Sequence, residues 1–174
     1  MSKLQQINIF IIDDNRVFSL ALKANIEVTF EKMNIKIHLF EIGEKCKTMF
    51  KLVLPELVIL DYNLNSDYPS ASNGIKVLEW IKKENQDTSV IMLTSEDNVD
   101  LAVKSFLYGA SDYVVKTPTQ FNKINYSLRN IFKIMESRSD VRKYKRHRIA
   151  LFVCIALLVG GIITLQILSF SLNK

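Results

Sequence analysis

Cysteine is scarce in this sequence, because only Cys46 and Cys154 occur among 174 residues. One lies among charged residues and the other inside an apolar run, and neither belongs to a spacing that is typical of a zinc site. We therefore expect no disulfide framework, and a reducing compartment fits this composition. We also expect no secretory signal, because a strand-like apolar run begins after a single lysine near the amino terminus.

Net charge is also nearly absent from most of the chain. Residues 1–137 hold 16 Lys and Arg against 17 Asp and Glu, whereas residues 138–148 hold six Arg and Lys and a single Asp. The high isoelectric point therefore comes from one short stretch, and nucleic-acid binding by the main domain has no charge support. Hydrophobic residues make up 48% of the chain, so we expect a packed core rather than disorder.

Charge is missing altogether from residues 149–172. A helix of that length spans roughly 36 Å, which is enough to cross a hydrocarbon core of about 30 Å. A buried helix in a soluble core is the alternative, but such helices seldom run so long without a charge. The sequence therefore predicts a transmembrane helix at 149–172, after a basic juxtamembrane segment at 137–148.

The charges around this predicted span indicate its orientation. Six cationic residues precede the span and only Lys174 follows it. The positive-inside rule then predicts a single-pass protein of the inner (cytoplasmic) membrane, with the main domain facing the cytoplasm. The basic segment should also rest on anionic lipid head groups.

Segments with strand-like and helix-like patterns alternate along residues 1–136. Short apolar runs predict strands at 7–12, 35–42, 56–60, 89–93 and 111–115. Helical spacing predicts helices at 15–33, 43–52, 74–85, 98–110 and from 119 to about 136. Short buried strands that alternate with helices are typical of a parallel sheet with helices on both faces. We therefore expect an α/β fold with a doubly wound, five-stranded parallel sheet.

The apolar positions of two segments support the helix predictions. The segment 15–33 carries Val17, Leu20, Ala21, Ala24 and Val28 near helical spacing, and in the other segment the apolar residues form one stripe. In the helix at 74–85 it consists of Ile75, Leu78 and Ile81, with Trp80 in the core nearby. Gly109 is expected to end the fourth helix.

Polar side chains directly follow four of the predicted strands: Asp13 and Asp14, then Asp61, Thr94 and Lys116. Doubly wound sheets place their sites at the carboxyl ends of the strands, so these side chains should meet at one edge. Three carboxylates in one place repel one another strongly, and a hard cation with oxygen ligands, such as Mg²⁺, removes that conflict. A lysine and a hydroxyl beside the acids suit an arriving phosphoryl group.

Each of these residues also has a simpler explanation when it is taken alone. Asp13 or Asp14 could cap the next helix, Thr94 could do the same, and a lone lysine usually lies in solvent. All of these explanations would have to coincide at one sheet edge. The combination therefore favours a site for phosphoryl transfer onto an aspartate.

Four segments carry a resemblance to a known family: IFIIDDN, VILDYN, IMLTS and DYVVK. Together they resemble the receiver domain of bacterial two-component response regulators, over residues 5 to about 135. The resemblance implies a flavodoxin-like fold, Mg²⁺ as cofactor, and a sensor histidine kinase or phosphotransfer protein as the phosphoryl donor. It implies no catalysis beyond the chain's own phosphoryl transfer and slow self-dephosphorylation.

The same resemblance implies the metal ligands. Asp61 looks like the phosphoacceptor and also one of the ligands of Mg²⁺. Asp14 looks like the direct ligand, with Asp13 acting largely through water. Asn63, two residues after the acceptor, would offer its backbone carbonyl. A small phosphatase with an aspartate nucleophile is disfavoured, because such enzymes commonly carry a second Asp where this chain has Asn63.

On the phosphoryl side, the resemblance makes Thr94 the switch hydroxyl, Tyr113 the switch aromatic and Lys116 the phosphoryl-binding lysine. The chain departs from the family at two places. Twelve residues, 62–73, separate the acceptor from the next helix, where the family usually has a shorter loop. The family usually has proline directly after the lysine, whereas here Thr117 intervenes before Pro118. We therefore expect a local difference in the lysine loop.

The expected organisation is a receiver domain at 1–136, the juxtamembrane segment at 137–148 and the span at 149–172, with no DNA-binding or enzymatic output domain. Phosphorylation would then change the contacts of the receiver at the membrane, either by self-pairing as a homodimer or by binding a partner. Two alternatives stay open. The chain could be a constitutive membrane-bound docking module, or a phosphate sink that drains a kinase.

Overall fold

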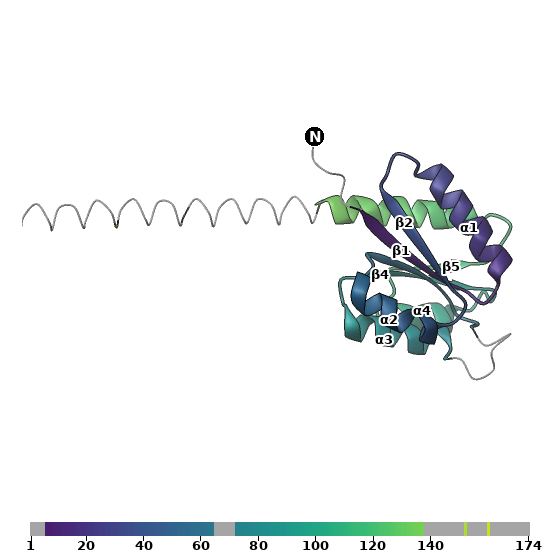
Figure 1. The fold of residues 1–174 in the computed structure, drawn as a ribbon. Coiled ribbons are helices and arrows are strands. Elements are labelled where there is room, and N and C mark those ends of the chain that lie inside the picture. The colour runs from purple at the N-terminus through teal and green to yellow at the C-terminus, as the bar shows by residue number, and fades with distance from the viewer. Residues whose placement is uncertain (1–5, 65–71, 138–151, 153–159, 161–174) are drawn as a thin grey trace, which may run out of the picture. The chain divides into compact units, whose positions relative to one another are not determined.

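The computed structural model describes residues 6–64, 72–137, 152 and 160, which are coloured in Figure 1. The chain forms two compact units, Met1–Arg129 and Asn130–Lys174, and the fold below is that of the first. The predicted span at 149–172 lies outside the described residues except for Phe152 and Gly160, and so does all but residue 137 of the basic segment. Within the described part of the chain, no helix has both the length and the apolar character needed to cross a bilayer. The predicted domain limit at 136 stays a prediction.

Five parallel strands form one sheet in the order β2-β1-β3-β4-β5. They are β1 (Ile7–Ile12), β2 (Ile35–Phe40), β3 (Leu57–Asp61), β4 (Ser89–Thr94) and β5 (Asp112–Val115). The strand order reverses between β1 and β3, because the chain moves from β1 outward to β2 and then returns to the other side of β1. The predicted five-stranded, doubly wound parallel sheet is confirmed.

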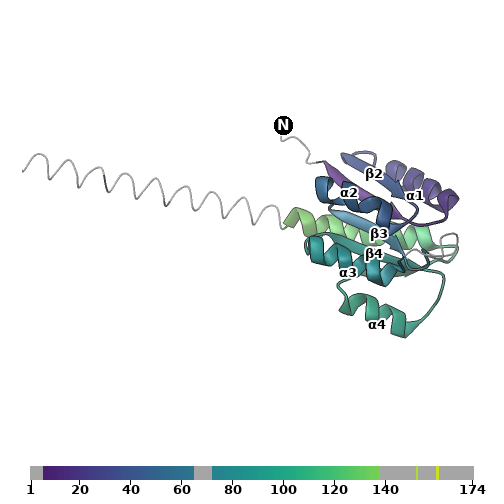
Figure 2. The same ribbon diagram turned by 60° about the horizontal axis from the view of Figure 1, so that its bottom comes forward.

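Helices cover both faces of this sheet, as parallel strands require. They are α1 (Arg16–Thr29), α2 (Gly43–Val53), α3 (Gly74–Glu84), α4 (Val99–Leu107) and a helix that begins at residue 120. Figure 1 shows α2, α3 and α4 on the face opposite α1, and Figure 2 shows them side by side across it. Residues 120–129 lie beside α1, where the Asn125 Nδ2 donates to the Asn25 Oδ1 at 2.8 Å.

The two central strands explain why their segments are continuously apolar in the sequence. Ile9–Ile12 in β1 and Leu57–Leu60 in β3 are fully buried, because helices pack on both sides of them. Toward α2 and α3, Phe10 packs edge-on against Phe50 with ring centroids 6.1 Å apart. The core therefore fixes the two strands at whose carboxyl ends the acids lie.

The predicted helix α1 is present, but the apolar residues that indicated it are not the ones that it buries. Val17 is 78% exposed and Val28 is 76% exposed, and Leu20, Ala21 and Ala24 are exposed as well. The buried residues of the helix are Ser19, Leu22 and Ile26. The helix carries apolar residues on more than one face, so spacing alone does not select the buried one. The larger apolar side chains, Leu22 and Ile26, lie on the buried face. The first turn is capped by the Asn15 Oδ1, which accepts a hydrogen bond from the Phe18 N–H at 3.0 Å.

The other helix predictions hold with small changes at the ends. Ile75, Leu78 and Ile81 of α3 are buried, while Trp80 is half-buried and its ring lies 5.0 Å from that of Phe50. Helix α4 ends at Leu107, followed by Tyr108 as the C-cap. Gly109 comes next with a φ of +95°, a left-handed conformation that favours glycine.

Gly74, the first residue of α3, lies directly against the end of β3. Its N–H donates to the Tyr62 carbonyl at 2.9 Å. A Cβ at this position would lie 2.5 Å from the Asp61 carbonyl oxygen and 2.7 Å from the Tyr62 Cα. Since backbone atoms cannot move aside as a flexible side chain can, only glycine lets α3 begin at this distance from Asp61.

We expect Gly74→Ala to lower the free energy of unfolding by about 2 kcal/mol, because the added methyl group overlaps backbone atoms. Urea unfolding of the full-length protein in mild detergent, followed by circular dichroism, measures this change. Lys76→Ala is the matched control, since Lys76 is exposed in the same helix and its loss should change the unfolding free energy by less than about 0.5 kcal/mol. Equal stability of the two variants would contradict the close approach.

Candidate functional site

Three carboxylates meet at the carboxyl ends of β1 and β3. Asp13 and Asp14 follow β1 directly, and Asp61 is the last residue of β3. One oxygen from each of the three lies within 4.8 Å of the others. Asp13 is only 1% exposed and Asp61 only 3%, while Asp14 is half-buried. The predicted convergence of the acids is therefore present, and it follows from the pairing of β1 with β3.

Lys116, the residue after β5, reaches two of these acids. Its ammonium nitrogen lies 2.8 Å from the Asp13 Oδ2 and 2.9 Å from the Asp61 Oδ2. Its backbone N–H donates to the Thr94 carbonyl at 2.7 Å, which continues the pairing of β5 with β4 beyond the strand. The lysine thus reaches the site although Thr117 follows it, and the described residues contain no cis peptide bond.

Negative charge is in excess at this edge, because three carboxylates face one ammonium group. Burial, and then the neighbouring charge of Asp61, raise the pKa of Asp13 to about 6. Burial also raises the pKa of Asp61 above its ordinary value, although Lys116 opposes that change. Burial alone would lower the pKa of Lys116, but Asp13 and Asp61 outweigh it and raise that pKa. Burial of the ionised carboxylates of Asp13 and Asp61 is therefore unfavourable, and a single ammonium group does not offset it.

The three acids fit a hard divalent cation. The Asp61 Oδ1 is buried and has no hydrogen-bond partner, which is costly for a carboxylate oxygen. A cation beside Asp13, Asp14 and Asp61 would satisfy that oxygen and balance the remaining charge, and Mg²⁺ prefers such oxygen ligands. The Asn63 Nδ2 donates to the Ser95 Oγ at 3.2 Å. A metal contact by the Asn63 carbonyl stays a prediction.

Thr94 and Tyr113 both bind the backbone of Glu96, in the loop between β4 and α4. The Thr94 Oγ1 is at the buried end of β4 and accepts from the Glu96 N–H at 3.1 Å. The Tyr113 hydroxyl donates to the Glu96 carbonyl at 3.0 Å. The structure thus connects the two predicted switch residues through one peptide segment.

The simpler explanations for the site residues fail on this geometry. Asn15, not Asp13 or Asp14, supplies the side chain that caps α1. Asn98, not Thr94, caps α4 by accepting from two backbone N–H groups. The Lys116 side chain is only 20% exposed and is therefore not a solvated surface lysine. Asp13, Asp14, Asp61 and Lys116 thus form one cluster, while the Thr94 hydroxyl bonds the loop that follows β4.

Sequence reasoning missed three residues of this cluster. Ser95 and Glu96 contact Asn63, Thr94 and Tyr113 as described above, and the ring of Phe18 lies beside the Lys116 ammonium. For Ser95 and Glu96 the available signal was their position directly after Thr94. For Phe18 it was only an aromatic residue one helical turn after the paired acids.

Comparisons with known proteins agree with this architecture. The family model described as the response regulator receiver domain matches residues 9–128. The regulatory protein AtoC of Escherichia coli K12 is 23% identical over 134 residues, which are 77% of this chain and 27% of that protein. The chain thus spans about a quarter of the length of the curated relatives it matches first.

Solved structures share the fold. The signal receiver domain of a LuxO repressor protein from Vibrio parahaemolyticus has a TM-score of 0.66 at 25% identity, covering 78% of this chain and 97% of that one. A response regulator protein from Burkholderia pseudomallei, solved with a phosphorylated aspartic acid and a calcium ion, has a TM-score of 0.60 at 20% identity. That match covers 76% of this chain and 72% of the other.

The raised pKa of Asp13 predicts a pH effect on stability in the absence of divalent cations. Between its ordinary value of 3.8 and about 6, folded Asp13 keeps a proton that the unfolded chain has released, so stability falls as pH rises through this window. Asp13→Asn lacks the titrating group. In EDTA, the unfolding free energy of the wild type relative to this variant should fall by roughly 2–3 kcal/mol between about pH 4 and pH 7.

Chemical unfolding at a series of pH values measures this difference. Added Mg²⁺ provides the control, because it binds the ionised carboxylates and should oppose the loss of stability at the upper end of the range. Parallel pH profiles of the wild type and Asp13→Asn in EDTA would contradict the assignment.

Proposed function

The chain belongs to the response regulator receiver domain family, and we propose that Asp61 is its phosphoacceptor, with Mg²⁺ held by Asp13, Asp14 and Asp61. The observation that carries this proposal is the buried cluster of three carboxylates around one lysine, with an Asp61 oxygen that has no partner. A sensor histidine kinase or a phosphotransfer protein would supply the phosphoryl group, as receiver domains accept it from such partners.

In the proposed step, a carboxylate oxygen of Asp61 attacks the phosphorus of the donor. A phosphorus–oxygen bond forms as the bond between phosphorus and the donor histidine breaks, and the leaving imidazole keeps that electron pair and takes a proton from solvent. The bound cation would neutralise charge on the phosphoryl oxygens. Lys116 already lies 2.9 Å from the Asp61 Oδ2 and needs only a small movement to pair with a phosphoryl oxygen.

Thr94 and Tyr113 would transmit the result. The Thr94 hydroxyl is buried at the end of β4 and can donate its proton to a phosphoryl oxygen on Asp61. A movement of Thr94 would disturb its bond from the Glu96 N–H, and the Glu96 carbonyl is the group that Tyr113 binds. The β4–α4 loop is therefore the element that we expect to change first.

Acetyl phosphate with Mg²⁺ tests the acceptor directly. We expect the full-length protein to gain one phosphoryl group at Asp61, as an acyl phosphate that hydroxylamine removes, because acyl phosphates react with that nucleophile. Intact-mass spectrometry and radiolabel counting measure the uptake. Asp61→Asn is the matched control, since it keeps the side-chain size and removes the nucleophilic carboxylate. Labelling of that variant to the wild-type level, or none of the wild type, would reject Asp61 as the acceptor.

We also propose that residues 149–172 anchor the receiver in the inner membrane, with the receiver in the cytoplasm. Support comes from the sequence alone: 24 residues without a charge, preceded by six Arg and Lys within 138–148. Anchoring would confine the receiver to two dimensions, where self-pairing as a homodimer or binding of a partner needs less intrinsic affinity.

Carbonate extraction of membranes tests the anchor. We expect the full-length protein to stay with the lipid pellet, because a helix of this apolar length is not released by high pH. A variant that ends at residue 148 should move to the soluble fraction or bind the pellet only at low salt, through its basic segment. Release of the full-length protein by carbonate would contradict the span.

Two alternatives are separated from this proposal by cross-linking in membranes, with and without labelling by acetyl phosphate. A constitutive docking module would not need phosphorylation, so cross-linking in membranes would be identical with and without acetyl phosphate. A phosphate sink would be labelled at Asp61 and would also show no change in cross-linking. A change that is lost in Asp61→Asn supports phosphorylation-dependent output.

A further inference from the structure

The Lys116 ammonium contacts an aromatic ring in addition to the two carboxylates. The Lys116 Nζ lies over the Phe18 ring, 4.8 Å from its centroid. A cation within about 6 Å of a ring face is attracted by the negative potential of that face. The ammonium of Lys116 therefore has Asp13 and Asp61 on one side and a ring on another.

The Phe18 ring is itself held in place from two helices. Phe18 lies in the first turn of α1, and its N–H donates to the capping Asn15 Oδ1 at 3.0 Å. Its ring packs against that of Phe121, with centroids 5.7 Å apart and planes tilted by 41°. Phe18 is half-buried, and the contact with Phe121 restrains the side of its ring that does not face the lysine.

The ring contact differs from the other contacts of this ammonium group in one respect. In the proposed reaction Asp61 becomes an acyl phosphate and loses its carboxylate charge, while Asp13 stays an anion that would share its charge with a cation. Both ion pairs of Lys116 are weakened by those changes, whereas the attraction of a ring for a cation is not. Among the described contacts of the Lys116 ammonium, the Phe18 ring is thus the one that persists through the reaction.

We propose that Phe18 is a positioning residue, whose ring keeps the Lys116 ammonium at the phosphoryl site while its ion pairs change. The proposal rests on Asp61 being the phosphoacceptor. The lysine has no proline directly after it to stiffen the chain, since Thr117 occupies that place, so side-chain contacts carry more of its orientation. Phe18 acts through Lys116 and does not touch the reacting atoms.

The rate of labelling by acetyl phosphate and Mg²⁺ tests the proposal on the full-length protein in mild detergent. Phe18→Leu keeps an apolar side chain but removes the ring, and it should slow labelling about three- to tenfold. Phe18→Tyr keeps the ring and should stay within about twofold of the wild type. Labelling that is equally slow in both variants would show that packing, and not the ring face, matters, and would overturn the proposal.

Further variants distinguish an effect of Phe18 that acts through Lys116 from an effect of a general loss of structure. In a Lys116→Met background, Phe18→Leu should cause no further slowing, since the cation is already absent. Phe30→Leu is the matched control, because the Arg129 guanidinium lies 5.3 Å from that ring centroid and Phe30 is the C-cap of α1, at the other end of the helix from Asp13 and Asp14. An equal slowing by Phe18→Leu with and without Lys116 would overturn the proposal.

A spectroscopic measurement needs no phosphorylation and keeps the two hypotheses apart. In protein labelled with ¹³C-lysine, the ring current of Phe18 should shift the Lys116 ε-methylene protons upfield, with the resonance assigned by its loss in Lys116→Met. The shift should disappear in Phe18→Leu and persist in Phe18→Tyr. Failure of the wild type to take up phosphate would refute the acceptor alone, whereas absence of the ring-current shift in the wild type would refute the role of Phe18.

Discussion

An excess of buried negative charge is the constraint on which this site depends. Asp13, Asp14 and Asp61 lie together because β1 and β3 are neighbours, and Lys116 alone among the described side chains of the cluster carries a positive charge. The lysine reaches them from the end of β5, although β4 lies between β5 and β3 in the sheet. A divalent cation would balance this excess, and the proposed phosphorylation of Asp61 needs such a cation because a phosphoryl group adds further negative charge.

The packing of the core keeps the three carboxylates close together although they repel one another. The acids follow the two strands that are buried on both faces, so moving them apart would disturb the centre of the core. Gly74 lets the start of α3 lie directly against the backbone of Asp61. The site is thus preorganised by packing, which is the condition under which electrostatic stabilisation of a transferred group is effective.

Much of the sheet and of the site could be predicted from the sequence. Central parallel strands are continuous apolar runs, and their topology places whatever follows them at one edge, so the positions of Asp61 and Lys116 followed from pattern alone. The buried face of α1 could not be predicted, because its apolar residues occupy several faces and only packing in the folded chain decides between them. The role of Phe18 was hidden for the same reason, since its direction depends on the phase of that helix.

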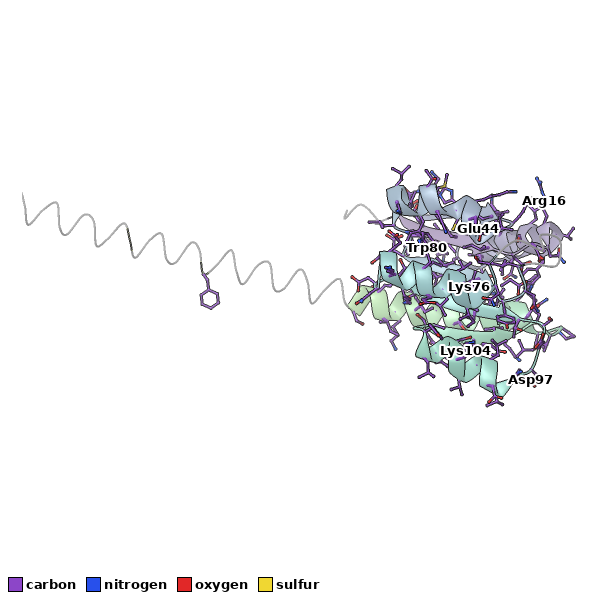
Figure 3. All side chains as sticks on the ribbon, turned by 90° about the horizontal axis from the view of Figure 1, so that it is seen from below. Arg16, Glu44, Lys76, Trp80, Asp97 and Lys104 are labelled. Carbon is purple, nitrogen blue, oxygen red and sulfur yellow. The ribbon has the colours of Figure 1, made fainter. Side chains whose placement is uncertain are left out.

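Trp80 gives the molecule a built-in optical reporter. It is the sole tryptophan of the chain and belongs to α3, and Figure 3 labels its position. Its ring lies edge-on to that of Phe50, and the Lys47 ammonium lies 5.5 Å from its centroid. Indole emission is sensitive to a nearby charge, and Trp80 belongs to the helix whose first residue abuts Asp61. An event at the acidic edge that moves α3 would therefore change the intrinsic emission, without an attached dye.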